Sequence, residues 1–235
     1  MKKRFIIANW KSYKTSLEAK EWLQEISNFQ FPISDETDII VCPSFTLLPE
    51  MHRFITEKNM PLKLGTQDIS QFGEGAYTGA INVKQAAECV THAIVGHSER
   101  RKYFHETDED VLAKVKVLVE NNLTPILCIS DVKQLEYYLK EETVLIDQAD
   151  KIIFVYEPPS AISGGEAFHA ESPDVANENA GKFSEMIGKS VVMLYGGSVN
   201  PENASDLFVQ ENIDGGLVGQ ASLDADKFMQ IIKAS

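Results

Sequence analysis

Short apolar runs of strand type recur along the whole chain and constrain its fold more than any other feature. They are rich in β-branched residues and mostly lack polar alternation, which is typical of strands buried on both faces. Their spacing of about 30 residues is the size of a strand–helix–strand unit. The eight runs read RFIIAN at 4, DIIVC at 38, LKLGTQ at 62, HAIVGH at 92, TPILCI at 124, KIIFVYE at 151, VVMLYGG at 191 and GGLVG at 215.

Amphipathic helical patterns lie between these runs. Apolar residues recur at i, i+3, i+4 and i+7 spacings within residues 19–26, 47–55 and 111–118. No low-complexity linker or break in composition interrupts the alternation. We therefore predict a single α/β domain over residues 1–235, folded as a closed parallel (β/α)8 barrel. A doubly wound open sheet stays open as the alternative, because periodicity alone does not separate the two.

The composition limits the possible functions. The net charge of −13 argues against nucleic-acid or anionic-membrane partners, which need basic faces. The chain has no apolar run of about 18 residues to span a membrane, and its N-terminal apolar stretch is too short for a signal peptide. Cys42, Cys89 and Cys128 are far apart and form no CxxC pair. They indicate reduced thiols in a cytoplasmic protein rather than disulfides or a zinc site.

The chemistry of such a barrel lies where strands end and loops begin. Glu157 ends the sixth apolar run. It is either a solvated carboxylate at the rim or a general base. Burial would strengthen it as a base by disfavouring its charged form, if Ile162 of the next loop and Leu217 of the last strand close over it.

His97 and Lys11 follow the fourth and first runs. Ser98 could cap a short helix, whose positive end would disfavour a charged His97 imidazole. A neutral imidazole would then donate a hydrogen bond to a substrate oxygen. Lys11, near Asn9, would need a partner inside the barrel mouth, because stranding a buried ion costs several kcal/mol. Glu99 is the expected partner.

Two glycine-rich segments, YGGSVNPEN and DGGLVGQAS, follow the last two strands. One such turn is weak evidence, because any turn favours glycine. Two of them in adjacent late positions of a barrel commonly build a phosphate site from backbone N–H groups. Such groups bind an anion without net positive charge, which is compatible with the acidic composition.

Together, ANWK, GHSERR, YEP, YGGSV and LVGQASL resemble the triosephosphate isomerase family, in the expected order along nearly the whole chain. The resemblance implies a (β/α)8 enzyme of glycolysis and gluconeogenesis that interconverts dihydroxyacetone phosphate and D-glyceraldehyde 3-phosphate without metal or cofactor. Glu157 would move a proton between C1 and C2, and His97 would transfer protons at the two oxygens. Lys11 would stabilise the enediolate with support from Glu99, and Asn9 would orient the substrate.

The resemblance also implies a phosphate site and a closing loop. The family closes its sixth loop over the substrate, which excludes water and protects the enediolate from losing phosphate. Ile162 and Leu217 would shield the base when that loop closes. The phosphate would be held by the backbone N–H groups of Ser163, Ser198, Gly219 and Gln220.

The stretch QFGEGAYTGAI at residues 71–81 resembles the family's protruding third loop. In the family this loop docks into a second subunit, and Thr78 would reach the neighbour's site. A homodimer is therefore implied. Taken without the resemblance, the same stretch is a surface loop, and sedimentation distinguishes the two.

The sequence departs from the family pattern at several positions. Pro159 and Ser160 replace the usual Val-Trp of the sixth loop, so we expect altered loop timing with retained activity. Asp131 replaces a usual glutamate, and the stretch 133–150 is shorter than typical, which should trim the fifth helical layer. Gln220 replaces a common glycine and keeps the needed N–H if its φ is negative.

Two other functions remain compatible with these residues. Another phosphate-handling barrel, such as phosphoribosylanthranilate isomerase, would keep both glycine loops but would not need Lys11, His97 and Glu157 together. A non-enzymatic barrel that binds partners would need none of the three. Binding of a phosphoglycolate-type enediolate mimic separates the first hypothesis from both.

Overall fold

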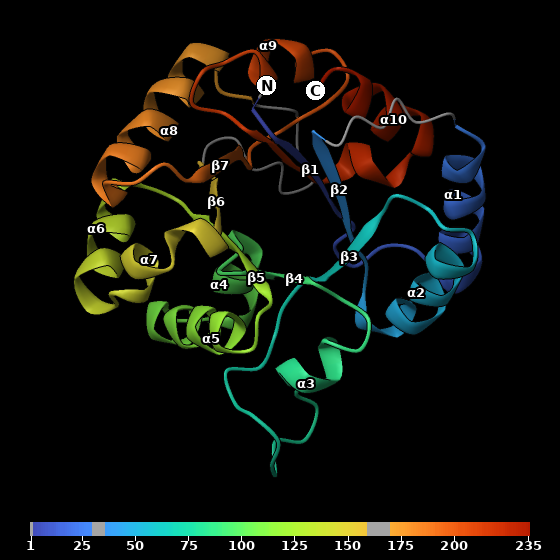
Figure 1. The fold of residues 1–235 in the computed structure, drawn as a ribbon, viewed down its shortest axis with the longest axis horizontal. Coiled ribbons are helices and arrows are strands. Elements are labelled where there is room, and N and C mark those ends of the chain that lie inside the picture. The colour runs from blue at the N-terminus through green and yellow to red at the C-terminus, as the bar shows by residue number, and fades with distance from the viewer. Residues whose placement is uncertain (1, 30–35, 159–169) are drawn as a thin grey trace.

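The eight apolar runs form eight parallel strands that close into a barrel in chain order, with β8 hydrogen-bonded to β1 (Figure 1). The computed structural model describes residues 2–29, 36–158 and 170–235. Closure confirms the predicted (β/α)8 barrel and excludes the open doubly wound sheet. The strands are β1 (Arg4–Asn9), β2 (Thr37–Cys42), β3 (Lys63–Thr66), β4 (His92–Val95), β5 (Thr124–Ile129), β6 (Ile153–Tyr156), β7 (Val192–Tyr195) and β8 (Gly215–Val218).

Helices surround the strands as an outer ring (Figure 1). The buried residues of the first helix are Ala19, Trp22, Leu23 and Ile26, the stripe that the sequence predicts. None of the described helices is long and apolar enough to cross a membrane. The helices are α1 (Ser16–Asn28), α2 (Leu48–Glu57), α3 (Val83–Ala86), α4 (Ser98–Phe104), α5 (Asp108–Glu120), α6 (Val132–Glu141), α7 (Val144–Asp147), α8 (Pro173–Ile187), α9 (Ala204–Phe208) and α10 (Ala225–Lys233).

The core has two layers, because successive side chains of a strand point to opposite faces. Ile7 of β1 belongs to the cluster inside the barrel, whereas its neighbours Ile6 and Ala8 belong to the cluster between strands and helices. Ile94 and Leu194 lie in the inner cluster from β4 and β7. A slip of one residue would exchange the side chains of the two layers, so the register depends on how each side chain fits its layer and not on apolar character alone.

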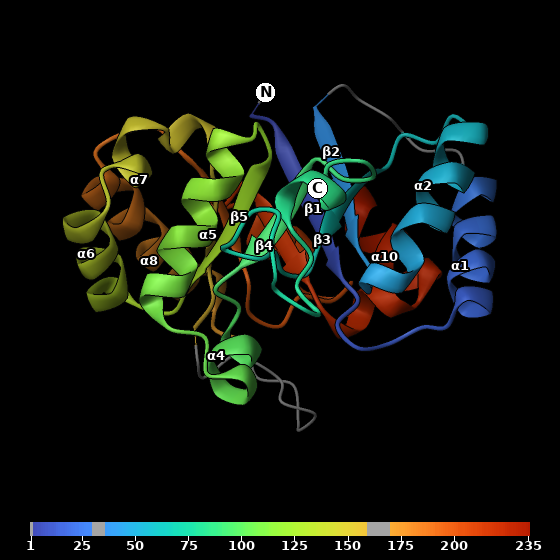
Figure 2. The same cartoon turned by 90° about the horizontal axis from the view of Figure 1, so that it is seen from below.

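The carboxyl ends of all eight strands lie on one face of the barrel. Figure 2 shows α4 on this face and the N-terminus on the opposite one. Parallel pairing with sequential order brings every strand-to-helix loop to the same rim. Asp131, in one of these loops, is the N-cap of α6 and accepts a hydrogen bond from the Gln134 N–H at 2.9 Å. The departure from the family pattern at this position thus starts a helix.

Candidate active site

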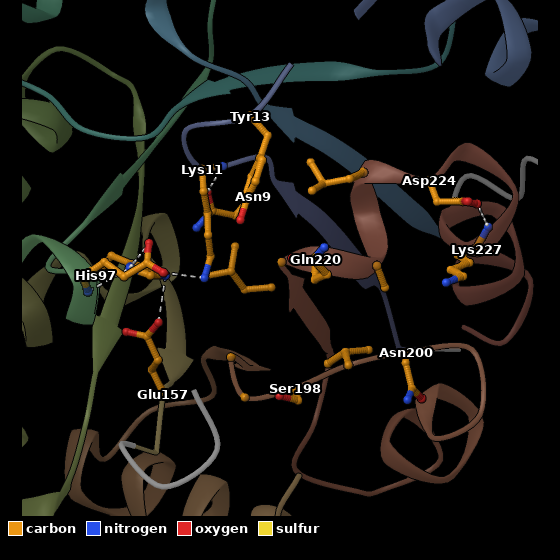
Figure 3. Close-up of a pocket in the computed structure, with 18 of the residues that line it drawn as sticks. Asn9, Lys11, Tyr13, His97, Glu157, Ser198, Asn200, Gln220, Asp224 and Lys227 are labelled. Carbon is orange, nitrogen blue, oxygen red and sulfur yellow. Dashed lines mark hydrogen bonds and ion pairs between the residues drawn. The ribbon is translucent and has the colours of Figure 1, made fainter. Parts of the chain in front are cut away.

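A cavity of about 630 Å³ opens at the carboxyl ends of the strands. Figure 3 shows side chains from the first, fourth, sixth and last loops pointing into it. Ile162 and Ser163, two of the predicted site residues, lie outside the described residues, and Thr78 lies in the loop after β3. The other predicted residues all line the cavity: Asn9, Lys11, His97, Glu99, Glu157, Ser198, Leu217, Gly219 and Gln220.

The Glu157 carboxylate is buried, with 1% of the residue exposed. Its Oε2 accepts a hydrogen bond from the Ser98 N–H at 2.9 Å, and its Oε1 lies 2.9 Å from His97 Nε2. The Ser98 N–H belongs to the first turn of α4 and has no acceptor within the helix, and this helix end favours negative charge. The fold therefore holds an ionisable carboxylate out of water with directed donors.

His97 presents a defined tautomer to the cavity. Its Nδ1 accepts a hydrogen bond from the Glu99 N–H at 3.1 Å, so the imidazole side chain is itself the N-cap of α4. The prediction that Ser98 is the cap is wrong, because Ser98 is already the first helical residue. An accepting Nδ1 leaves the proton on Nε2, and the imidazole is then neutral and a donor toward Glu157.

Lys11 is a fixed cation at the end of β1. Its ammonium pairs with Glu99 Oε1 at 2.6 Å, which confirms the predicted partner. Its backbone has φ 50°, a left-handed conformation that costs a lysine about 1–3 kcal/mol. Asn9 Oδ1 accepts from the Lys11 N–H at 3.1 Å, and Gln67 Nε2 donates to both Lys11 O and Cys42 O at 2.9 Å. These side chains stabilise the strained turn.

The two glycine-rich loops meet Lys11 and Glu157 at close range. A Cβ added to Gly219 would lie 3.8 Å from the Lys11 ammonium, and one added to Gly196 would lie 3.5 Å from Glu157 Cβ. Gln220 is not among the described residues with positive φ. A negative φ is required for Gln220 to present its N–H without strain, and this condition is met. The glycine-rich loops, a cation and an acid thus line one cavity.

Other lining residues carried no signal in the sequence. Tyr13, Tyr103, Asp224 and Lys227 border the mouth of the cavity. Asp224 and Lys227 lie at the start of α10, which follows the loop that carries Gln220 (Figure 3). Within the described part of the chain, no cluster of His, Cys, Asp and Glu is placed to hold a metal ion.

Comparison with known proteins places this geometry in a family. The family model described as "Triosephosphate isomerase" matches residues 4–235. Proteins named triosephosphate isomerase from Trichodesmium erythraeum and Fusobacterium nucleatum are 38% and 39% identical over 244 and 255 residues. These alignments cover 99% and 100% of this chain, and 99% of each relative. The relative of the same name from Thermus thermophilus is 34% identical over 251 residues, with 99% of both chains covered.

The chain belongs to the triosephosphate isomerase family. Membership favours the first of the three hypotheses that the sequence left open. Two departures from the family pattern can be placed: Asp131 caps α6, and Gln220 avoids positive φ. Pro159 and Ser160 lie outside the described residues, so the expected change in the timing of the sixth loop of this family member stays a prediction.

Proposed function

We propose that this chain interconverts D-glyceraldehyde 3-phosphate and dihydroxyacetone phosphate through an enediolate, in glycolysis and gluconeogenesis. Family membership and the names of the relatives support this reaction. The observation that carries the assignment of roles is the 2.9 Å contact between Glu157 Oε1 and His97 Nε2 in the cavity that also holds the Lys11 ammonium. An acid, a neutral donor and a cation can act there on one three-carbon molecule.

In this proposal the substrate phosphate binds the backbone N–H groups of Ser198, Gly219 and Gln220, and of Ser163 outside the described residues. Oriented amides hold an anion through their dipoles and need no net positive charge, so the chain's net charge of −13 does not prevent binding at this position. Asn9 orients the carbonyl end of the substrate. This arrangement fixes the reacting carbons between Glu157 and His97.

The proton transfer then uses contacts already present in the structure. Glu157 removes a proton from C1 of dihydroxyacetone phosphate, the C–H electron pair becomes the C1–C2 double bond, and the carbonyl electrons move onto the C2 oxygen. That oxygen replaces Glu157 as the acceptor of the His97 Nε2–H. Return of the proton from Glu157 to C2, with proton exchange at the oxygens through His97, completes the aldose.

Lys11 stabilises the negative charge that develops on the substrate oxygen. Its 2.6 Å pair with Glu99 fixes the ammonium in place. Leu217 is buried and lines the cavity, where it contributes an apolar wall. Together with Ile162 it would exclude water from Glu157 when the sixth loop closes.

A coupled assay of the purified protein with D-glyceraldehyde 3-phosphate tests the proposed reaction. We expect formation of dihydroxyacetone phosphate without added metal or cofactor, with competitive inhibition by 2-phosphoglycolate. A folded, pure preparation that shows no isomerisation would contradict the proposal. Isomerisation of phosphoribosylanthranilate instead would support the alternative barrel enzyme.

We also propose that the chain acts as a homodimer through the loop after β3. The tip of this loop projects beyond the ring of helices (Figure 1). Phe72 and Tyr77 stack at 4.4 Å between ring centroids, and each is 45% exposed. A rigid, exposed aromatic pair is typical of a protein–protein contact. Thr78, next to this pair, would reach the neighbour's site.

Replacing Tyr77 by aspartate is expected to weaken dimerisation at least tenfold, because aromatic anchors dominate such interfaces. Sedimentation velocity over a concentration series measures the change, and specific activity should fall as monomer forms. Val209→Asp is the control, since Val209 is also exposed but directly follows α9, which lies on the opposite side of the helical ring from this loop (Figure 1). A wild-type protein that sediments as a monomer at all concentrations would contradict the dimer.

We further propose a cytoplasmic location and no nucleic-acid or membrane partner. All three cysteines are free, and burial raises the pKa of the Cys42 and Cys128 thiols well above the usual range. These thiols stay protonated, so they are poor nucleophiles and poor partners in thiol–disulfide exchange. The strongly acidic composition supports the absence of polyanionic partners.

A further inference from the structure

Glu171 joins the ends of two neighbouring strands. It lies two residues before α8, which packs outside β6 and β7 (Figure 1). Its backbone N–H donates to the Tyr195 hydroxyl at 3.1 Å, and its Oε1 accepts from the Tyr156 hydroxyl at 3.3 Å. Tyr156 and Tyr195 are direct partners in the β6–β7 register. One residue thus bridges both tyrosines.

These two tyrosines directly precede the groups proposed to act on the substrate. Tyr156 comes immediately before Glu157, and Tyr195 comes before the glycine pair that leads to Ser198. The Tyr195 hydroxyl folds back onto Gly197, where a Cβ would collide with it. The orientation of these two tyrosines therefore bears on the base and on the start of the phosphate loop.

Tyr156 is held on several sides. Its ring meets Phe183 of α8 edge to face at 5.4 Å between centroids, and Asn179 Nδ2 donates to its hydroxyl at 2.9 Å. The hydroxyl therefore accepts from Asn179 and donates to Glu171. These hydrogen bonds favour one orientation of the Tyr156 side chain. Glu171 is the final acceptor in the series from Asn179 through Tyr156.

The Glu171 carboxylate is placed at an energetic cost. Its Oε2 is buried and has no hydrogen-bond partner among the described residues. Burial raises the pKa of the Glu171 carboxyl, and the bond from Tyr156 offsets only part of that rise. Burying a carboxyl oxygen without a partner destabilises the fold.

We propose that Glu171 is a positioning residue of the isomerase, which fixes Tyr156, and through it Glu157, relative to the loop that carries Ser198. The inference rests on the proposed function. Its physical basis is that Glu157 must meet the substrate carbon within a fraction of an ångström. A misplacement of about 1 Å costs up to about 100-fold in rate.

The test compares Glu171→Ala, Glu171→Gln and Tyr156→Phe in steady-state assays of the full chain. Glu171→Ala and Tyr156→Phe are expected to lower kcat by roughly 10- to 100-fold, with KM within about twofold, because the base moves and the phosphate site does not. Glu171→Gln keeps an acceptor oxygen and should recover most of kcat. Glu178→Ala is the matched control, an exposed glutamate of α8 paired with Lys182 at 2.7 Å.

The double variant Glu171→Ala/Tyr156→Phe decides whether the two residues act together. If they do, its kcat should be no lower than that of the worse single variant. The inference would be overturned if the loss of kcat in the double variant equalled the product of the two single losses. Single variants with wild-type kcat and only a lower melting temperature would also overturn it. If Glu171→Ala does not fold, Tyr156→Phe with unchanged kcat overturns it instead. If the wild type itself shows no isomerisation, the proposed function fails, and the positioning role that rests on it fails with it.

Discussion

Glu157→Gln is expected to lower kcat by about 10²- to 10⁴-fold, the usual contribution of a positioned general base. The amide keeps the shape of the side chain but cannot take up the substrate proton. Affinity for 2-phosphoglycolate should change far less, because the phosphate is proposed to bind the amides of other loops. Coupled assays in both directions and an inhibition constant for 2-phosphoglycolate measure the two effects separately.

Glu157→Asp distinguishes a base from a merely structural acid. It keeps the carboxylate and withdraws it by one methylene, about 1.5 Å. Turnover is expected to fall by about 100-fold, again with much smaller loss of inhibitor affinity. For Glu157→Gln, the control for the loss of a negative charge is Glu178→Gln, at an exposed position of α8. Equal losses of turnover and inhibitor affinity in Glu157→Asp would contradict its assignment as the base.

The strands and the rim of the barrel could be predicted because both depend on local sequence. A strand buried on both faces must be apolar throughout, and Ile6, Ile7 and Ala8 show the consequence: all three are fully buried, in two different layers. Parallel strands joined in chain order bring their ends to one rim. Residues after strand ends, such as His97 and Glu157, therefore meet whatever their separation in the chain.

The supporting contacts could not be predicted, because they depend on side-chain directions between distant segments. Gln67 bonds Lys11 across 56 positions, and Glu171 bonds Tyr195 across 24. Nothing in the spacing of these residues marks the pairs. The prediction of Ser98 as the N-cap of α4 is wrong for a similar reason. Serine is a common N-cap residue, and only the orientation of the imidazole in the structure shows that His97 takes this role.

The opposite end of the barrel holds a titratable group that the reaction does not use. His92 opens β4 and is 6% exposed, and its Nδ1 lies 2.7 Å from the Thr91 hydroxyl. Burial lowers the pKa of His92 to about 4, and the positive charges of Lys63 and Lys3 act in the same direction, against the opposing effect of Asp38. The imidazole is therefore neutral in the folded protein over most of the pH range in which a free histidine titrates.

Acidification from pH 6.5 to pH 4 is expected to remove up to about 3 kcal/mol of stability through His92 alone. In this window the unfolded chain binds the proton and the folded chain does not, so the free energy of unfolding falls as pH falls. His92→Asn has an amide that stays neutral and can still bond Thr91, and it should lack this component. Urea unfolding of wild type and His92→Asn at the same protein concentration, repeated in steps between pH 7 and pH 4, gives the free energy of unfolding of each protein at each pH. His52→Asn, at an exposed histidine of α2, is the control and should keep the wild-type dependence of stability on pH. If stability falls equally with pH in wild type and in His92→Asn, His92 does not stay neutral on folding.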